Sequence, residues 1–481
     1  MTLIGSMLSA LLGFAFSILL AREFGAYNAG VVLQAIAIFT IGLSIAKLGL
    51  DTTAIWLLPP MRADAPVELR SALVRLLAPA FLFGLVLVGL WQVVQLGLSH
   101  QGRAGEVLDA VGASLWFLPF ASLMTVALAC SRAVGGVLPY NAIGNVLVPA
   151  LRPAGLVAVA ALGGGGLAVA IVWSVPWLIG AVAAVAVVAV LVPRTAGPRW
   201  PRPGRTLLRR IAGYSLPRTL ASILEQLLLW MDVVLVGLIL GSAAAGIYGS
   251  SSRFINLGLI VATSLRIVVA PRFSALMARR EHAQVEQLYA VTARWILLFG
   301  GPAYALLFVF APTVLGWLGE GFSDGVPVLR ILCAGSLVVL AAGNVQSLLL
   351  MSGHSGWSAL NKAIVVTVNI VGNIILLPVM GLVGAAWVWA ACMVLDTVLA
   401  AFQVHRWTGI ALDVKALAFA GMGVVVAAVA PAYVVAALFG QSTTALLVAG
   451  FVVLAATLAF AWLARRTVHL DELVSLGRSG R

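Results

Sequence analysis

Apolar runs of about 20 residues, bounded by Gly, Pro or charged residues, recur from one end of the chain to the other. A helix of that length crosses a hydrocarbon layer of roughly 30 Å. The alternation of apolar and polar residues that marks membrane strands is absent, which favours helices over a barrel. The pattern therefore predicts about fourteen transmembrane helices, with cores near 2–21, 29–50, 73–97, 110–131, 138–161, 166–192, 214–240, 244–268, 293–317, 326–351, 358–378, 382–404, 416–438 and 443–464.

Composition supports an all-α integral membrane protein. Of the 481 residues, 62% are hydrophobic and 9% are charged, which excludes an ordinary soluble domain. The formal net charge is +13, but no basic soluble segment is present that could act on nucleic acid, so we expect no nucleic-acid partner. Cys130, Cys333 and Cys392 lie singly in apolar segments, so neither a disulfide framework nor a zinc site is implied.

The basic residues are distributed unevenly between alternate loops. With a cytoplasmic N-terminus, the even-numbered loops and the C-terminus are also cytoplasmic, and they hold Arg62, Arg70, Arg132, Arg272, Arg279, Arg280, Lys362, Arg406, Lys415, Arg465 and Arg466. The opposite loops hold little beyond Arg22 and Arg103. This asymmetry predicts a multi-pass protein of the inner (plasma) membrane with both termini in the cytoplasm.

The loop after the sixth predicted helix is the most basic part of the chain. It contributes Arg194, Arg199, Arg202, Arg205, Arg209, Arg210 and Arg218. We interpret it as a determinant of topology that also contacts anionic membrane lipids. It also divides the chain into a six-helix N-terminal lobe (1–192), the basic cytoplasmic loop (193–213), a six-helix C-terminal lobe (214–405), an additional helix pair (416–464) and a cytoplasmic tail (465–481).

Internal similarity supports two related lobes. GAYNAGV at 25–31 resembles GSAAAGI at 241–247, and GNVLVP at 144–149 resembles GNIILLP at 372–378. The two pairs have nearly the same separation along the chain, as a duplicated unit requires. An even number of helices gives both lobes the same polarity, which is the parallel-repeat plan of many secondary transporters, with the substrate path between the lobes.

Motifs for enzymatic chemistry are missing. The sequence contains no GxxxxGK[ST], HExxH or GxSxG, and the near miss SGHSGW at 352–357 is interpreted as a turn. The five histidines fall near predicted loops or termini, which argues against a metal site. We therefore expect a protein that is not an enzyme and has no metal or other cofactor.

Polar residues inside the predicted helices are the candidate functional residues, because a bilayer makes them costly. In the seventh helix Glu225 and Asp232 are seven residues apart and share one face. Arg253 lies about halfway along the eighth helix, and Asp396 in the inner half of the twelfth.

Further polar residues occur in the second, fifth and eleventh helices. Arg152 lies between Pro149 and Pro153 and shares a face with Asn141 and Asn145, while Asn369 and Asn373 are four residues apart. All these residues could line a cavity, or they could form ion pairs and hydrogen bonds that only hold the bundle together. For Lys47 and Asp51, four apart near the inner end of the second helix, we favour a structural ion pair.

Three stretches resemble a known family. DVVLVGLILGSAAAGIYGSSSRF, followed by APRFSAL, is similar to the seventh and eighth helices of Wzx-like polysaccharide flippases of the MOP superfamily. LLMSGHSGWSALNKAIVVTVNIVGNIILLPVMGLVGAA is similar to their tenth to twelfth helices, and AREFGAYNAG to the turn after their first. The resemblance covers residues 1 to about 405.

The resemblance implies a two-lobed alternating-access carrier that moves an undecaprenyl-diphosphate-linked oligosaccharide to the outer leaflet, for cell-surface polysaccharide such as lipopolysaccharide. We expect Arg152 and Arg253 to bind the diphosphate, because guanidinium groups suit phosphate. We expect the glycan to be bound by Asn141, Asn145, Asn369 and Asn373. We expect a coupling H⁺ or Na⁺ to be bound by Glu225, Asp232 and Asp396. Membrane lipids and a polysaccharide polymerase or other assembly machinery are the remaining candidate partners.

Three alternatives stay open. One is a MATE-type cation or drug antiporter, because related MATE proteins place cation-binding carboxylates in the seventh helix, where Glu225 lies. Another is a lipid II flippase, in which the last two helices would bind the lipid tail. A membrane glycosyltransferase or polymerase would need catalytic acids in a sizeable outer loop, whereas the longest one, SHQGRAGEVLDA, is short.

Overall fold

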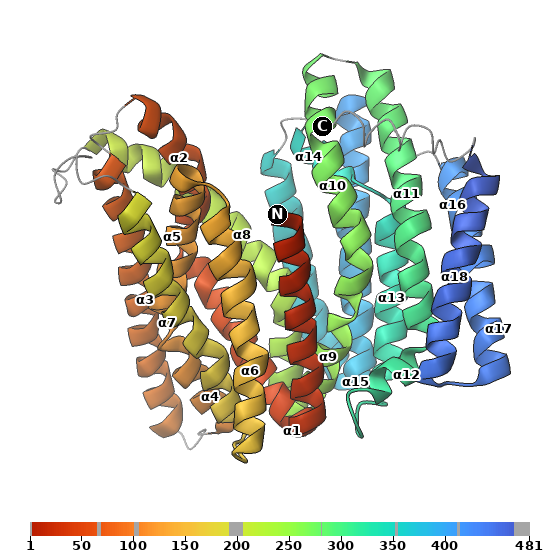
Figure 1. Ribbon diagram of the computed structural model, residues 1–481, viewed down its shortest axis with the longest axis horizontal. Helices are drawn as coiled ribbons and strands as arrows, with labels where there is room; N and C mark the ends of the chain where they lie inside the picture. The colour runs from red at the N-terminus through yellow and green to blue at the C-terminus, as the bar shows by residue number, and fades with distance from the viewer. Residues whose placement is uncertain are drawn as a thin grey trace. The chain divides into compact units, whose positions relative to one another are not determined.

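The computed structural model describes residues 2–64, 69–100, 105–191, 205–279, 281–351, 355–410 and 414–465. Within these ranges every regular element is a helix and no strand occurs (Figure 1). The chain forms two compact units, Met1–Gly246 and Ile247–Arg481. The predicted all-helical class is therefore confirmed.

The first unit is built from long helices around one main core. Its elements are α1 (Thr2–Ala46), α2 (Leu50–Asp64), α3 (Leu69–His100), α4 (Glu106–Leu115), α5 (Leu118–Gly135), the π-helix η2 (Tyr140–Leu147), α6 (Val148–Ala161), α7 (Gly166–Leu191), α8 (Arg205–Leu240) and the start of α9 (Ser242–Arg253). Leu57, Leu73, Ala127 and Ala184 of α2, α3, α5 and α7 pack together in the core. The helix α1 packs against α4, α6 and α8.

The second unit continues from α9. Its elements are α10 (Ile255–Ala278), α11 (His282–Val309), α12 (Ala311–Gly316), α13 (Gly325–Ala341), α14 (Val345–Met351), α15 (Ser355–Thr408), α16 (Val414–Val424), the π-helix η3 (Val425–Val429), α17 (Ala430–Phe439) and α18 (Thr443–Leu463). Phe273, Tyr289, Leu348 and Val404 form one core cluster. The last helices pack on α11, where Trp295 is fully buried.

Ten helices in the described ranges are long and apolar enough to cross a membrane, or eleven if α13 and α14, bent by 47° at their junction, count as one. Two of the ten, Gly5–Arg62 and Gly356–Thr408, have 58 and 53 residues. At 1.5 Å per residue each far exceeds a hydrocarbon layer of roughly 30 Å. Each is interrupted by a glycine with non-helical backbone, Gly25 (φ 72°) and Gly381 (φ 58°). The predicted number of fourteen transmembrane helices stays a prediction.

Contacts within α15 show that it folds back on itself at Gly381. Asn361 and Gln403 exchange two amide hydrogen bonds of 2.7 and 2.8 Å. Nearer to the break, the Cys392 thiol lies 3.7 Å from the Val365 carbonyl oxygen. Because the paired positions converge on residue 381, the two limbs of α15 form an antiparallel hairpin.

The predicted repeat GAYNAGV/GSAAAGI forms a close crossing of α1 with the first turn of α9. A Cβ atom added at Gly30 would collide with the Ser242 carbonyl oxygen, and one added at Gly246 would collide with the Ala26 carbonyl oxygen. Gly25 and Gly241, the first residues of the two segments, both have positive φ. Equivalent residues of the repeat thus play equivalent parts on the two sides of one contact.

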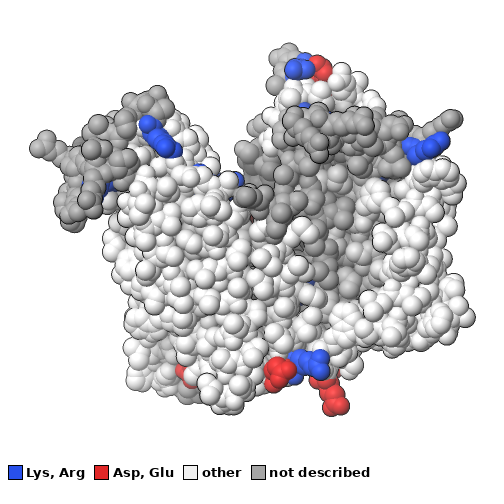
Figure 2. Space-filling view, viewed as in Figure 1, with Lys and Arg blue, Asp and Glu red and all other residues white. Residues whose placement is uncertain are grey.

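The surface agrees with a membrane environment. Large apolar side chains such as Leu90, Val190 and Phe451 are 58%, 85% and 74% exposed. Most of the described part of the face in Figure 2 carries no Lys, Arg, Asp or Glu. An exposed apolar surface of this extent needs lipid to cover it. Part of the predicted basic loop, 193–204, and most of the predicted tail, 466–481, lie outside the described residues, while 205–213 is the beginning of α8.

Candidate functional site

Arg152 lies on α6 with its guanidinium group over two tryptophans of α7. The Cζ atom is 4.4 Å from the ring centroid of Trp173 and 5.1 Å from that of Trp177. Phe39 of α1 supports both rings, edge-on to Trp173 at 5.3 Å and stacked on Trp177 at 5.9 Å between centroids. Cation–π contacts of this kind fix the plane of a guanidinium group.

Among the described residues, no acid balances the charge of Arg152. Its Nε and Nη2 atoms are buried and have no hydrogen-bond partner in the part of the chain that the structure describes. No described carboxylate forms an ion pair with it. An uncompensated cation in a membrane-embedded unit is costly, so the group is suited to an anionic ligand.

The sequence pattern singles out Arg152 but not its aromatic partners. Trp173 and Trp177 are four residues apart in WSVPW and therefore share a helix face. That spacing indicates that the two rings lie on one face of the helix. The sequence does not indicate which arginine packs on that face.

Asn141 and Asn145 lie in the π-helix η2, immediately before α6. Asn145 Nδ2 donates to Asn141 Oδ1 at 2.8 Å, and Asn141 Nδ2 donates to the Val137 carbonyl oxygen at 3.0 Å. Gly5 of α1 faces the pair, since a Cβ there would lie 3.0 Å from Asn141 Oδ1. Asn141 is buried, whereas Asn145 is half-buried and its Oδ1 accepts no hydrogen bond from the described residues. A π-helix is frequent at functional sites.

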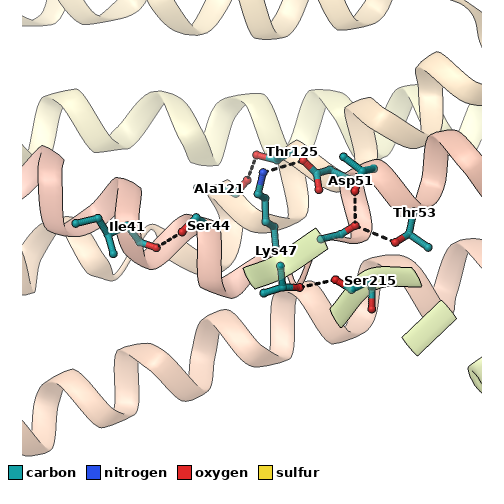
Figure 3. A network of polar contacts seen from close by, with 11 residues as sticks. Ile41, Ser44, Lys47, Asp51, Thr53, Ala121, Thr125 and Ser215 are labelled. Carbon is teal, nitrogen blue, oxygen red and sulfur yellow. Dashed lines mark hydrogen bonds and ion pairs between the residues drawn. The ribbon is translucent and has the colours of Figure 1, made fainter. Parts of the chain in front are cut away.

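Figure 3 shows a second polar network, where α1 gives way to α2. Lys47 Nζ is 2.8 Å from Asp51 Oδ2, which confirms the predicted ion pair. The turn between them includes Leu48 and Gly49 with φ of 49° and 62°. A Cβ at Gly49 would lie 2.7 Å from the Ser215 carbonyl oxygen of α8. The pair therefore joins a strained corner that packs on α8, as expected for a structural ion pair.

The two carboxylates of α8 differ in their surroundings. Asp232 is 3% exposed, whereas Glu225 is exposed and forms no hydrogen bond or ion pair with the described residues. They share a helix face, as predicted, but only Asp232 is covered. Arg253 of the second unit is the last residue of α9, at the bend that leads into α10. A cation at that position interacts favourably with the negative end of the helix dipole.

Asp396 is paired inside the α15 hairpin. Lys362 Nζ lies 2.5 Å from Asp396 Oδ2, and Gln346 Nε2 of α14 donates to the same oxygen at 2.9 Å. The charge pattern of the sequence places Lys362 among the cations of the cytoplasmic loops. In the structure Lys362 lies within α15 and forms an ion pair with Asp396. The sequence does not single out Gln346, because a lone glutamine in an apolar run carries no signal of its partner.

Asn369 and Asn373 lie on the first limb of α15 and are both buried. Asn373 Nδ2 donates to the Asn369 carbonyl oxygen at 2.9 Å and lies 3.4 Å from Asn369 Oδ1. The predicted residues thus fall into a group on η2 and α6, a pair on α8, and Arg253 with the α15 residues in the second unit. Among the described residues, no group of three or more His, Cys, Asp or Glu could hold a metal ion.

Comparisons with known proteins agree with this architecture. A sequence model of the polysaccharide biosynthesis protein family matches residues 143–327. The "Probable low-salt glycan biosynthesis flippase Agl15" of Haloferax volcanii is 26% identical over 42% of this chain and 43% of its own length. "Stage V sporulation protein B" of Bacillus subtilis is 25% identical over 45% of this chain and 44% of its own. The matches thus span less than half of the curated relatives.

Similar solved structures extend over more of the chain. An inward closed conformation of the lipid II flippase MurJ has a TM-score of 0.76 at 14% identity, covering 96% of this chain and 98% of that protein. An inward-facing multidrug resistance MATE transporter of the MOP superfamily has a TM-score of 0.67 at 16% identity, covering 83% and 94%. The resemblance found in the sequence is therefore confirmed: residues 143–327 are similar to polysaccharide biosynthesis proteins, and the chain has the fold of these MurJ and MATE transporter structures.

Proposed function

We propose that the chain is a flippase that carries a lipid-linked oligosaccharide, joined through a diphosphate such as undecaprenyl diphosphate, from the cytoplasmic to the outer leaflet of the plasma membrane. The fold and the glycan flippase among its relatives support this class of transporter. Alternating access, coupled to H⁺ or Na⁺, supplies the mechanism. The product would be passed to polysaccharide assembly machinery on the far side.

Arg152 is the observation that carries the proposal. Its guanidinium plane is held by Trp173 and Trp177, and two of its nitrogens have no partner among the described residues. Such a group can donate two parallel hydrogen bonds to one phosphate without first breaking an ion pair. Because the aromatic faces already order the side chain, little rotamer freedom is lost when the anion binds.

The other residues take roles that follow from their surroundings. In the second unit, Arg253 is a further candidate for binding phosphate, and Asn369 and Asn373 are candidates for binding sugar. In the first unit, Asn145 offers to sugar hydroxyls its Oδ1, which accepts no hydrogen bond from the described residues, and Asn141 holds Asn145 in place. Glu225 and Asp232 carry the coupling ion.

The test is flipping by the purified full chain in vesicles that contain a fluorescent lipid-diphosphate oligosaccharide. Arg152→Gln removes the charge, and Arg152→Lys keeps it but loses the planar fork. A lost charge-assisted hydrogen bond is worth about 1.5–3 kcal/mol, so we expect flipping to fall roughly 10- to 100-fold in Arg152→Gln and less in Arg152→Lys.

The matched control is Arg465→Gln. Arg465 also lies over a tryptophan, with its Cζ 5.4 Å from the Trp462 ring, but it is exposed at the end of the last helix. The Arg465→Gln variant should flip the labelled substrate at the same rate as the parent. If Arg152→Gln keeps full activity as well, Arg152 does not bind the diphosphate.

Two observations favour different cargo. The lipid II flippase fold covers 96% of the chain, including the last helices, so lipid II itself belongs in the same vesicle assay as a competing substrate. The exposed Glu225 on α8 favours a MATE-type antiporter. That function predicts proton-linked efflux of a cationic dye by the parent and its loss in Glu225→Gln. Dye efflux without glycan flipping would overturn the flippase proposal.

A further inference from the structure

Asp396 lies at a polar centre inside the second unit. Lys362 and Asp396 come from opposite limbs of α15, and Gln346 comes from α14. The carboxylate side chain is 8% exposed and the ammonium side chain 25% exposed. One carboxylate oxygen, Oδ2, receives both Lys362 and Gln346, while Oδ1 is buried without a hydrogen bond from the described residues.

The hairpin holds Lys362 against this carboxylate. Asn361, next to Lys362 in the sequence, forms a reciprocal amide pair with Gln403 on the other limb, and this pair fixes the register of the two limbs. A tethered ammonium group therefore competes with free cations at a high effective concentration. One buried carboxylate neutralises only one cation. A second cation at the same place would be an unpaired charge in the membrane, which is costly.

We propose that Lys362 is the resident cation of Asp396 and keeps free monovalent cations, Na⁺ in particular, away from this carboxylate. Asp396 is then not a carrier of the coupling ion, although it is an acid buried in a membrane helix. Lys362 determines whether a free cation can bind here. Without Lys362, a small cation would fill the site formed by the Asp396 carboxylate, with its buried Oδ1, and the Gln346 side chain.

The experiment measures the thermal stability of the purified full chain in detergent at about pH 8, where a free aspartate is ionised. Thermal unfolding curves are recorded in NaCl and in choline chloride at equal ionic strength, so that only specific binding of Na⁺ can shift Tm between the two salts. The parent is compared with Lys362→Gln, Asp396→Asn and the double variant Lys362→Gln/Asp396→Asn.

We expect the Na⁺-dependent rise in Tm to be the same in the parent and in Asp396→Asn. In Lys362→Gln we expect an additional, saturable rise on the order of 2 °C, which the double variant lacks. A folded Lys362→Gln protein that responds to Na⁺ no more than the double variant would overturn the proposal.

The comparison of the parent with Asp396→Asn provides a second test, which holds even if Lys362→Gln does not fold. A saturable Na⁺ response in the parent that disappears in Asp396→Asn would show that Na⁺ reaches Asp396 despite Lys362. All readouts are stabilities, so the outcome is independent of the cargo and of whether the flippase proposal stands.

Discussion

At the scale of single residues, the two asparagines of η2 differ in what their amide groups still offer. Both groups of Asn141 are used, one by Asn145 and one by the Val137 carbonyl. Asn145 uses only its NH₂ group within the described ranges. The same residue type, one helical turn apart, is thus committed to structure at the first position and available to a ligand at the second.

Replacing each asparagine by alanine should separate these roles. Asn141→Ala removes two hydrogen bonds made by a buried side chain and should lower the free energy of unfolding by about 1–3 kcal/mol, with the folded protein still active. Asn145→Ala should cost about 1 kcal/mol of stability but reduce glycan flipping roughly tenfold. Thermal unfolding and vesicle flipping, measured on the same preparations, check both. Undiminished flipping by Asn145→Ala would remove it from the site.

The sequence identified individual polar residues better than their partners. Arg152 and Asp396 stand out because charge is rare in apolar runs. Their environments depend on residues such as Phe39, which is over a hundred positions from Arg152, and on the hairpin that brings Lys362 to Asp396. No local pattern carries such contacts, because they arise only when helices pack.

At the scale of elements, glycines determine where helices break and where they cross. The apolar pattern located the helical stretches, but their boundaries depend on backbone breaks such as those at Gly25 and Gly381, which a hydropathy window does not detect. Conversely, the repeated glycines of 25–31 and 241–247 were visible in the sequence, and both sides of the α1–α9 crossing use them.

Adding one methyl group at this crossing should be severe. In Gly30→Ala and Gly246→Ala the new Cβ would collide with a backbone carbonyl oxygen, which cannot move aside as a side chain could. We expect each to lower the free energy of unfolding by about 3 kcal/mol or more. Gly13→Ala, on the same helix α1 with nothing within 4 Å of the new Cβ, is the control and should be neutral or slightly stabilising.

Thermal unfolding in detergent measures the stability of all three variants. A Gly30→Ala protein as stable as Gly13→Ala would mean that α1 and α9 do not approach closely at this point.

At the scale of the whole molecule, the distribution of basic residues predicts the orientation in the membrane. The three native cysteines are buried, so a membrane-impermeant thiol reagent should report only introduced ones. Leu162, 86% exposed between α6 and α7, belongs to a predicted outer loop, and His282, exposed at the start of α11, to a predicted cytoplasmic loop.

We therefore expect Leu162→Cys to be labelled in intact cells and His282→Cys only after the membrane is permeabilised. The reverse pattern would contradict the predicted cytoplasmic termini. The comparison with the unmodified chain, which should remain unlabelled in both conditions, shows that the native thiols are inaccessible.

The reciprocal contact of Gly30 and Gly246 has the form of an isologous interface, in which residue i of one partner meets residue j of the other and j meets i. Such symmetry is normal between two identical subunits and unexpected within one chain. If the repeat arose by gene duplication, the two glycines descend from one codon, and the ancestral half-length protein had a self-complementary patch on which two copies could dimerise. Fusion would then have made this contact permanent, with each glycine still required by the backbone of the other segment.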